Sequence, residues 1–85
     1  MPSEELLHRL EEAEALLADG FEDALIGQDR NTGRAVYSTH KMIDILVERD
    51  DMSYDDAVEY LEFNTFCAYV GEMTPIYIDL DKDWS

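Results

Sequence analysis

The stretch Met52-Ser53-Tyr54-Asp55-Asp56-Ala57 marks a junction between two helices and fixes the start of the second. Ser53 with Asp56 resembles a capping box, in which side-chain oxygens satisfy the free N–H groups of a first helical turn. Met52 and Ala57 occupy the two positions of a hydrophobic staple, which sets the angle at which the chain enters a helix. We therefore predict a helix that begins directly after Ser53.

Apolar residues at helical spacing continue on both sides of this junction. The following helix keeps its period to the region of Gly71, which can act as a C-terminal cap, although residues 66–70 also fit a strand. The preceding helix is capped by Ser38 or Thr39 and closes at residues 48–50. Its apolar face consists of Met42, Ile43, Leu46 and Val47.

Three segments have the composition of β-strands. Residues 24–27 and 34–37 flank a polar stretch that contains Asn31-Thr32-Gly33, which is typical of a hairpin with a longer loop. Further on, Pro75 forbids helix continuation, and residues 76–80 show the period-two pattern of a strand with one buried face. The inward positions of that strand are predicted to be Ile76, Ile78 and Leu80.

A first helix is predicted to begin after Ser3 and to end near Asp19, with Gly20 as its stop. The order of elements is then α-β-β-α-α-β within one domain that spans residues 1–85. We predict an α+β fold in which a three-stranded antiparallel sheet packs against helices on one face. The third strand is expected to pair with one of the two hairpin strands.

Three phrases of the sequence resemble a family of small uncharacterised proteins encoded by phages and environmental prokaryotes. They are GFEDALIG at 20–27, ERDDMSYDDAVEYLEFN at 48–64 and AYVGEMTPI at 68–76, and the similarity extends over roughly residues 20–78. The resemblance implies a viral or mobile-element setting and carries no activity with it. One departure is Asp51, where the family is expected to have Gly in a left-handed conformation, and Asp adopts that conformation at modest cost.

Acidic residues dominate the surface chemistry of this chain. Twenty-one Asp and Glu against six Lys and Arg give a formal net charge of -15 over 85 residues. Such a charge repels nucleic acid and anionic membrane and attracts basic protein surfaces. Because 46% of the residues are hydrophobic, the acid belongs to a folded domain rather than to a disordered tail. The dispersed basic residues, of which only Arg30 and Arg34 come close, are expected to neutralise nearby acids.

Residues that could carry catalysis are few. His8 is expected to be an exposed helical residue, and His40 a neutral imidazole next to the cap of the second helix; neither lies near Cys67 in the sequence. A single cysteine excludes an intramolecular disulfide and a multi-cysteine zinc site, so Cys67 is interpreted as a buried thiol in a reducing compartment. No glycine-rich phosphate loop is present. We therefore predict a protein that is not an enzyme and that has no catalytic residues and no cofactor.

One pattern of carboxylates resembles a metal site. Asp79, Asp81 and Asp83 alternate like the opening of a calcium loop, but Trp84 stands where that loop requires glycine. No dedicated metal site is predicted. The sequence has no apolar run near the roughly 18 residues of a membrane span, and residues 1–5 lack the features of a signal peptide. The expected location is the cytoplasm, without membrane association.

Five carboxylates are predicted to bind the partner. Asp55, Glu59 and Glu62 fall on one helix face and span about 10 Å at a rise of 1.5 Å per residue, and Asp51 and Asp56 flank them. A domain of this length has a diameter of about 30 Å, over which duplex DNA carries about 18 negative charges. The hypothesis is a phage-type inhibitor or DNA mimic that blocks a basic nucleic-acid-binding protein of host defence or transcription.

Two other interpretations compete with this hypothesis. The acid can instead reflect adaptation to a high-salt cytoplasm. Alternatively, the chain is a housekeeping protein-interaction module, with a homodimer possible, that makes apolar contacts while the acid provides solubility. Those contacts would come from the aromatic residues, most of which are expected in the core, namely Tyr54, Tyr60, Phe63, Phe66, Tyr69 and Tyr77.

Overall fold

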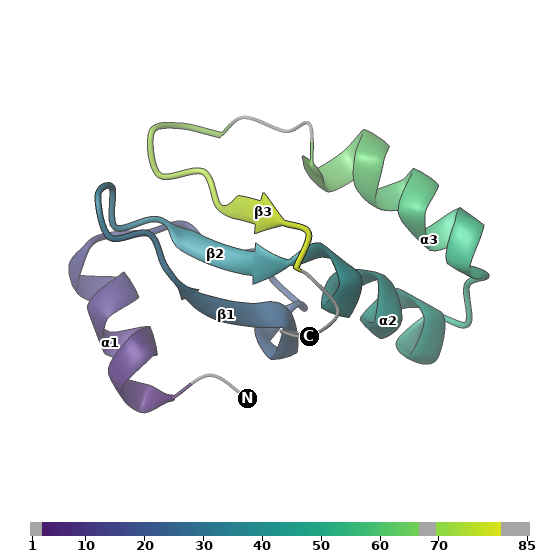
Figure 1. Ribbon diagram of the computed structural model, residues 1–85, viewed down its shortest axis with the longest axis horizontal. Coiled ribbons are helices and arrows are strands. Elements are labelled where there is room, and N and C mark those ends of the chain that lie inside the picture. Colours follow the sequence, from purple (N-terminus) through teal and green to yellow (C-terminus); the bar gives the residue numbers. More distant parts are fainter. Residues whose placement is uncertain (1–2, 67–69, 81–85) are drawn as a thin grey trace.

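The computed structural model describes residues 3–66 and 70–80 and has the predicted α+β class (Figure 1). Two short helical turns, η1 of 3-10 type and η2 of π type, were not predicted, so the order differs from the expected α-β-β-α-α-β. The elements are α1 (Glu4–Glu12), η1 (Glu22–Ala24), β1 (Leu25–Gln28), β2 (Ala35–Ser38), α2 (Thr39–Arg49), α3 (Tyr54–Leu61), η2 (Glu62–Phe66) and β3 (Ile76–Ile78).

The three strands form a mixed sheet in the order β1-β2-β3. The hairpin of β1 and β2 is antiparallel, as predicted, but β2 and β3 run parallel, so the prediction of a purely antiparallel sheet was wrong. The reason lies in the connection, because parallel neighbours require a long crossover. In Figure 1, α2 leads away from the end of β2 and α3 runs back beside it, so the chain re-enters next to the start of β2.

Serine hydroxyls begin all three α-helices. The Oγ of Ser3 accepts from the N–H of Leu6 at 3.1 Å, and Ser38 and Ser53 each cap the N–H three residues ahead. These bonds satisfy N–H groups that a helix leaves free in its first turn. The predicted starts of α2 and α3 are confirmed. Asp51 has a φ of 58°, so the predicted left-handed position is confirmed as well.

Helix α1 ends well before the predicted stop near Asp19. The N–H of Ala15 bonds to the carbonyl of Leu10 at 2.9 Å, and that of Glu14 bonds to Glu11 at 3.0 Å. These two bonds form a Schellman motif, which closes a helix with one left-handed residue. Glu14 takes that position with a φ of 57°, where glycine is usual. Helix α1 therefore ends at Glu12, although apolar residues continue at helical spacing beyond that point.

The core lies on one face of the sheet, around Tyr37, whose side chain is 1% exposed. The hydroxyl of Tyr37 accepts the N–H of Ala18 at 2.8 Å, which holds the segment after α1 against this face. Burial raises the pKa of Tyr37 above its ordinary value. Helices α1, α2 and α3 complete the core with Leu6, Leu10, Met42, Ile43, Leu46, Ala57 and Leu61.

The side chains of β3 point opposite to the prediction. Tyr77 packs against the core, with its ring 6.0 Å from that of Tyr37 and 5.1 Å from that of Phe66. Ile76 and Ile78 are half-buried and lie outside the core. Because Tyr77 is in register with Tyr37, the parallel pairing places both rings on the same face.

Removal of the Tyr37 hydroxyl is predicted to lower the free energy of unfolding measurably, because this hydroxyl accepts the N–H of Ala18. Tyr37→Phe keeps the ring but leaves the Ala18 N–H without its acceptor, so we expect a loss of about 1 kcal/mol in the free energy of unfolding. Urea denaturation followed by circular dichroism measures it. Tyr54→Phe is the matched control, because Tyr54 is 56% exposed. Equal stability of the two variants would contradict the role of this bond.

Candidate protein-binding face

The acidic side chains of this protein lie on the surface, and few of them pair with a basic side chain. Within residues 3–66 and 70–80, every Asp and Glu except Asp29 is exposed. In the same residues only one carboxylate, that of Asp50, lies within ion-pair distance of a lysine or arginine, at 3.2 Å from Arg49 Nε. The other pairs, His8 with Glu12 and His40 with Asp44, carry opposite charges only when the imidazole is protonated. The negative field therefore reaches the solvent.

Two arginines bind backbone carbonyls. Arg49 donates to the carbonyl of Gly20 at 2.7 Å and lies 5.5 Å from the centre of the Phe21 ring, so it joins the end of α2 to the segment before β1. Arg34 Nε donates to the carbonyl of Thr74 at 2.5 Å. Arg49 also pairs with Asp50. Hydrogen bonds from Thr32 and, to a smaller extent, the charge of Arg34 lower the pKa of Asp29, so both arginines act on nearby acids as predicted.

The five predicted partner-binding residues are all exposed on and beside α3. Ala57 and Leu61 turn inward to the core, so the helix presents its other side to solvent. Asp51 precedes α3, Asp55 and Asp56 occupy its first turn, Glu59 follows and Glu62 begins η2. Three of the five residues line two separate hollows. Asp56 and Glu59 line one of them, and Glu62 lines the other.

The first hollow contains aromatic side chains that we expected in the core. It has a volume of about 410 Å³ and is lined by Met52, Asp56, Glu59, Tyr60, Phe63 and Asn64. Phe63 is 78% exposed and Tyr60 is 44% exposed. The prediction of core positions was wrong for these two and for Tyr54. It is confirmed for Phe66 and Tyr77, which pack against the core, and Tyr69 lies outside the described residues.

Helical spacing was the signal that could have identified Phe63. At 100° per residue it projects roughly opposite to Leu61, which belongs to the core. A residue of this size, fully displayed among carboxylates, is unusual on the surface of a soluble protein. We define the α3 face as Asp51, Asp55, Asp56, Glu59, Tyr60, Glu62 and Phe63.

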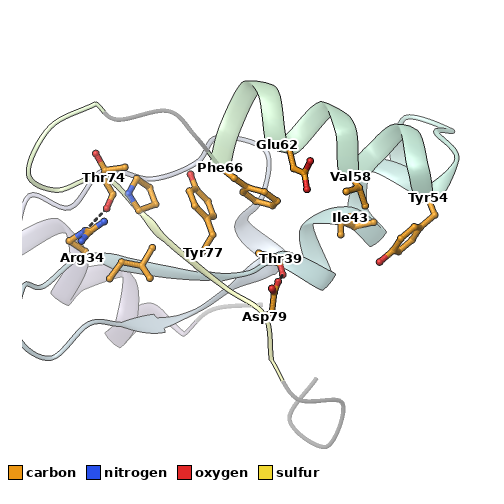
Figure 2. A pocket seen from close by; sticks show the side chains of 12 residues that line it. Arg34, Thr39, Ile43, Tyr54, Val58, Glu62, Phe66, Thr74, Tyr77 and Asp79 are labelled. Carbon is orange, nitrogen blue, oxygen red and sulfur yellow. Dashed lines mark hydrogen bonds between the residues drawn. The ribbon is translucent and has the colours of Figure 1, made fainter.

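The second hollow is a groove of about 850 Å³ between β3 and the helical segment formed by α3 and η2 (Figure 2). Val58 and Phe66 line the helical side, whereas Thr74 to Tyr77 line the strand side. Glu62 enters the groove from the helix and Asp79 from the end of β3. The first residue of α2, Thr39, also lines the groove. Its single hydroxyl hydrogen is shared between the Ile78 carbonyl, at 3.2 Å, and Asp79 Oδ1. Sequence reasoning did not find this groove.

The remaining predicted sites fall partly outside the described residues. Cys67 lies there, as do Asp81 and Asp83 of the calcium-like pattern, whereas Asp79 accepts from Thr39. Where the structure describes the chain, no group of three or more His, Cys, Asp or Glu side chains could hold a metal ion. Among the same residues, no helix has the length and apolar character needed to cross a membrane.

Comparison with known proteins adds no relatives to this description. No protein-family model, no curated protein and no solved structure matches the chain. The α3 face and the groove are therefore interpreted from their own residues.

Arg34 is predicted to position the strand that forms one side of the groove. Arg34→Met removes a charged donor from the Thr74 carbonyl, and we expect a loss of about 2 kcal/mol in the free energy of unfolding. Amide hydrogen exchange should accelerate at Ile76 and Ile78, because the entry to β3 loses its anchor. Arg30→Met is the matched control, since Arg30 is exposed on the same hairpin loop. Equal exchange rates in both variants would refute this role.

Proposed function

We propose that this protein is a non-enzymatic acidic binding protein that docks its α3 face onto a basic surface of a nucleic-acid-binding protein and blocks it. The observation that carries the proposal is uncompensated acid gathered around an exposed aromatic ring, with Asp56 and Glu59 lining the same hollow as Phe63. Carboxylates steer a basic partner toward the face, and a central aromatic residue supplies affinity once the partner has docked.

The size of the charge supports mimicry of DNA. The longest dimension of the molecule is 36 Å, a length over which duplex DNA carries about 21 negative charges. The chain carries -15 in a body of 36 × 26 × 22 Å. A protein that binds duplex through lysine and arginine would meet a field of similar strength here. Together with the family resemblance, this supports a phage-type inhibitor that acts on host defence or transcription proteins in the cytoplasm.

A second candidate function is an apolar interaction module, including a homodimer. The exposure of Phe63 and Tyr60 favours it, because an aromatic patch of this kind commonly marks a protein contact. Two copies that met through this patch would bring together two molecules of -15 each and their Asp56 and Glu59 carboxylates. Like-charge repulsion opposes such a dimer at low salt, so a basic partner fits the face better than a second copy.

Neutralising the acid of α3 is predicted to weaken partner binding. We expect the triple variant Asp55→Asn, Glu59→Gln, Glu62→Gln to lose affinity about tenfold or more at low salt, corresponding to about 1.4 kcal/mol. The partner is first captured from a prokaryotic lysate at low salt, identified and purified, and its affinity is then measured against salt concentration. Duplex DNA should compete with the protein for it.

The matched control for this variant carries the same charge change elsewhere. Glu5→Gln, Glu11→Gln and Glu48→Gln are exposed substitutions on α1 and α2, and we expect their combined effect to stay below about threefold. Binding that does not depend on salt, or an equal loss in both triple variants, would contradict the proposal. Unfolding of the unmodified protein in dilute buffer would instead support salt adaptation.

Phe63 is predicted to contribute affinity without contributing stability. Because its side chain is 78% exposed, Phe63→Ala should leave the free energy of unfolding within about 0.5 kcal/mol. We expect the affinity for the same purified partner to fall about tenfold at both low and high salt. Val70→Ala is the control, since Val70 is 63% exposed outside the α3 face. If both variants bind like the unmodified protein, Phe63 is not the anchor.

A further inference from the structure

We propose that the groove between β3 and α3 receives an extended basic segment of the partner, which adds to the sheet as a fourth strand beside β3. The inference rests on the proposed function, because it takes the partner to be basic. The inference adds main-chain hydrogen bonds as a third kind of contact. The other two are the carboxylates and the Phe63 ring of the α3 face.

The first observation is the open edge of the sheet. β3 pairs with β2 on one side, and no strand among the described residues pairs with its other side. The carbonyl of Ile78 accepts from Thr39, so the main chain of Ile78 is directed toward the β2 side. Because the main-chain groups of a strand alternate in direction, those of Tyr77 are directed away from β2, toward the free edge of the sheet. Unpaired groups of this kind are a template for a further strand.

The second observation is the volume of the groove. An extended chain occupies about 160 Å³ per residue, from a rise of about 3.3 Å, a strand spacing of about 4.8 Å and a layer thickness of about 10 Å. The groove of about 850 Å³ therefore has room for about five residues of a strand. A helical segment of that volume would be about one and a half to two turns long and would leave the strand edge unpaired.

The third observation is the chemistry of the two sides. Val58 and Phe66 are half-buried and offer apolar contacts to every second side chain of an added strand. Glu62 and Asp79 place carboxylates in the same groove from opposite sides, as Figure 2 shows. The one basic residue among the described lining residues is Arg34, whose Nε is bound to the Thr74 carbonyl.

Charge complementarity selects the occupant. A segment that alternates apolar and basic residues would bury the first kind and pair the second with Glu62 and Asp79. Pairing of two β3 edges from two copies would instead bring together two molecules of -15. The groove therefore fits a basic partner strand rather than a second copy of this chain.

The experiment uses peptides of equal composition and different pattern. A labelled heptapeptide of alternating lysine and valine is compared, by fluorescence anisotropy at low salt, with a heptapeptide in which the four lysines precede the three valines. We expect the alternating peptide to bind at least tenfold more tightly. Methylation of the amide of its central valine should weaken it about tenfold, because that change removes a main-chain donor. Exchange of the Tyr77 amide hydrogen should slow when the alternating peptide binds.

A protein variant locates the site without altering the strand. The double variant Glu62→Gln, Asp79→Asn should lower the affinity for the alternating peptide about tenfold, whereas Glu11→Gln, Glu48→Gln should change it less than threefold. Equal losses in the two variants would place the peptide elsewhere on the acidic surface and overturn the assignment of the groove.

The remaining outcomes separate this inference from the proposed function. Equal binding of the two peptides, with no effect of methylation, overturns strand addition and leaves attraction to basic partners in place. Failure of both peptides overturns the inference as well, and a salt-sensitive partner that depends on Asp55 and Glu59 would then show that the proposed function stands. A dimer detected by light scattering, with a protected Tyr77 amide in the absence of peptide, would assign the edge to a second copy.

Discussion

The buried side chain of Tyr37 connects the parts of this small structure. Its hydroxyl accepts the N–H of Ala18, which fixes the segment between α1 and β1, and its ring lies 6.0 Å from that of Tyr77. Tyr77 in turn contacts Phe66 of η2 at 5.1 Å. One side chain thus relates the N-terminal segment, the sheet and the helical segment after α3. In a domain with so modest a core, the loss of a contact shared by three segments is a large fraction of the total stability.

The groove is a consequence of the same arrangement. Because α2 and α3 form the crossover between β2 and β3, the chain brings α3 and η2 opposite β3, across the groove. Contact between Phe66 and Tyr77 holds this helical segment at one position along β3, and Arg34 fixes the entry to the strand through the Thr74 carbonyl. The space that remains between these anchors combines a strand edge, apolar walls and two carboxylates.

Local signals in the sequence predicted the elements they govern and little beyond them. Ser38 and Ser53 identified two helix starts, because a cap depends on neighbours within a few residues. The left-handed conformation of Asp51 was expected from the family resemblance instead. The direction of β3 and the inward side of Tyr77 depend on how two helices return the chain, and no short pattern encodes that. Likewise the carboxylates of α3 were identified as surface residues, whereas the groove arises only when α3 and β3 come together.

Charge and shape have different roles in the proposed binding. Acidic residues spread over the whole chain produce a long-range electrostatic field that would attract any basic protein. The field therefore affects the rate of encounter more than the choice of partner. Selectivity requires features that only some partners can match. The exposed ring of Phe63 and the strand edge at Tyr77 are features of that kind, and both lie beside the carboxylates of α3. A surface adapted only to salt would need the acid but neither of these.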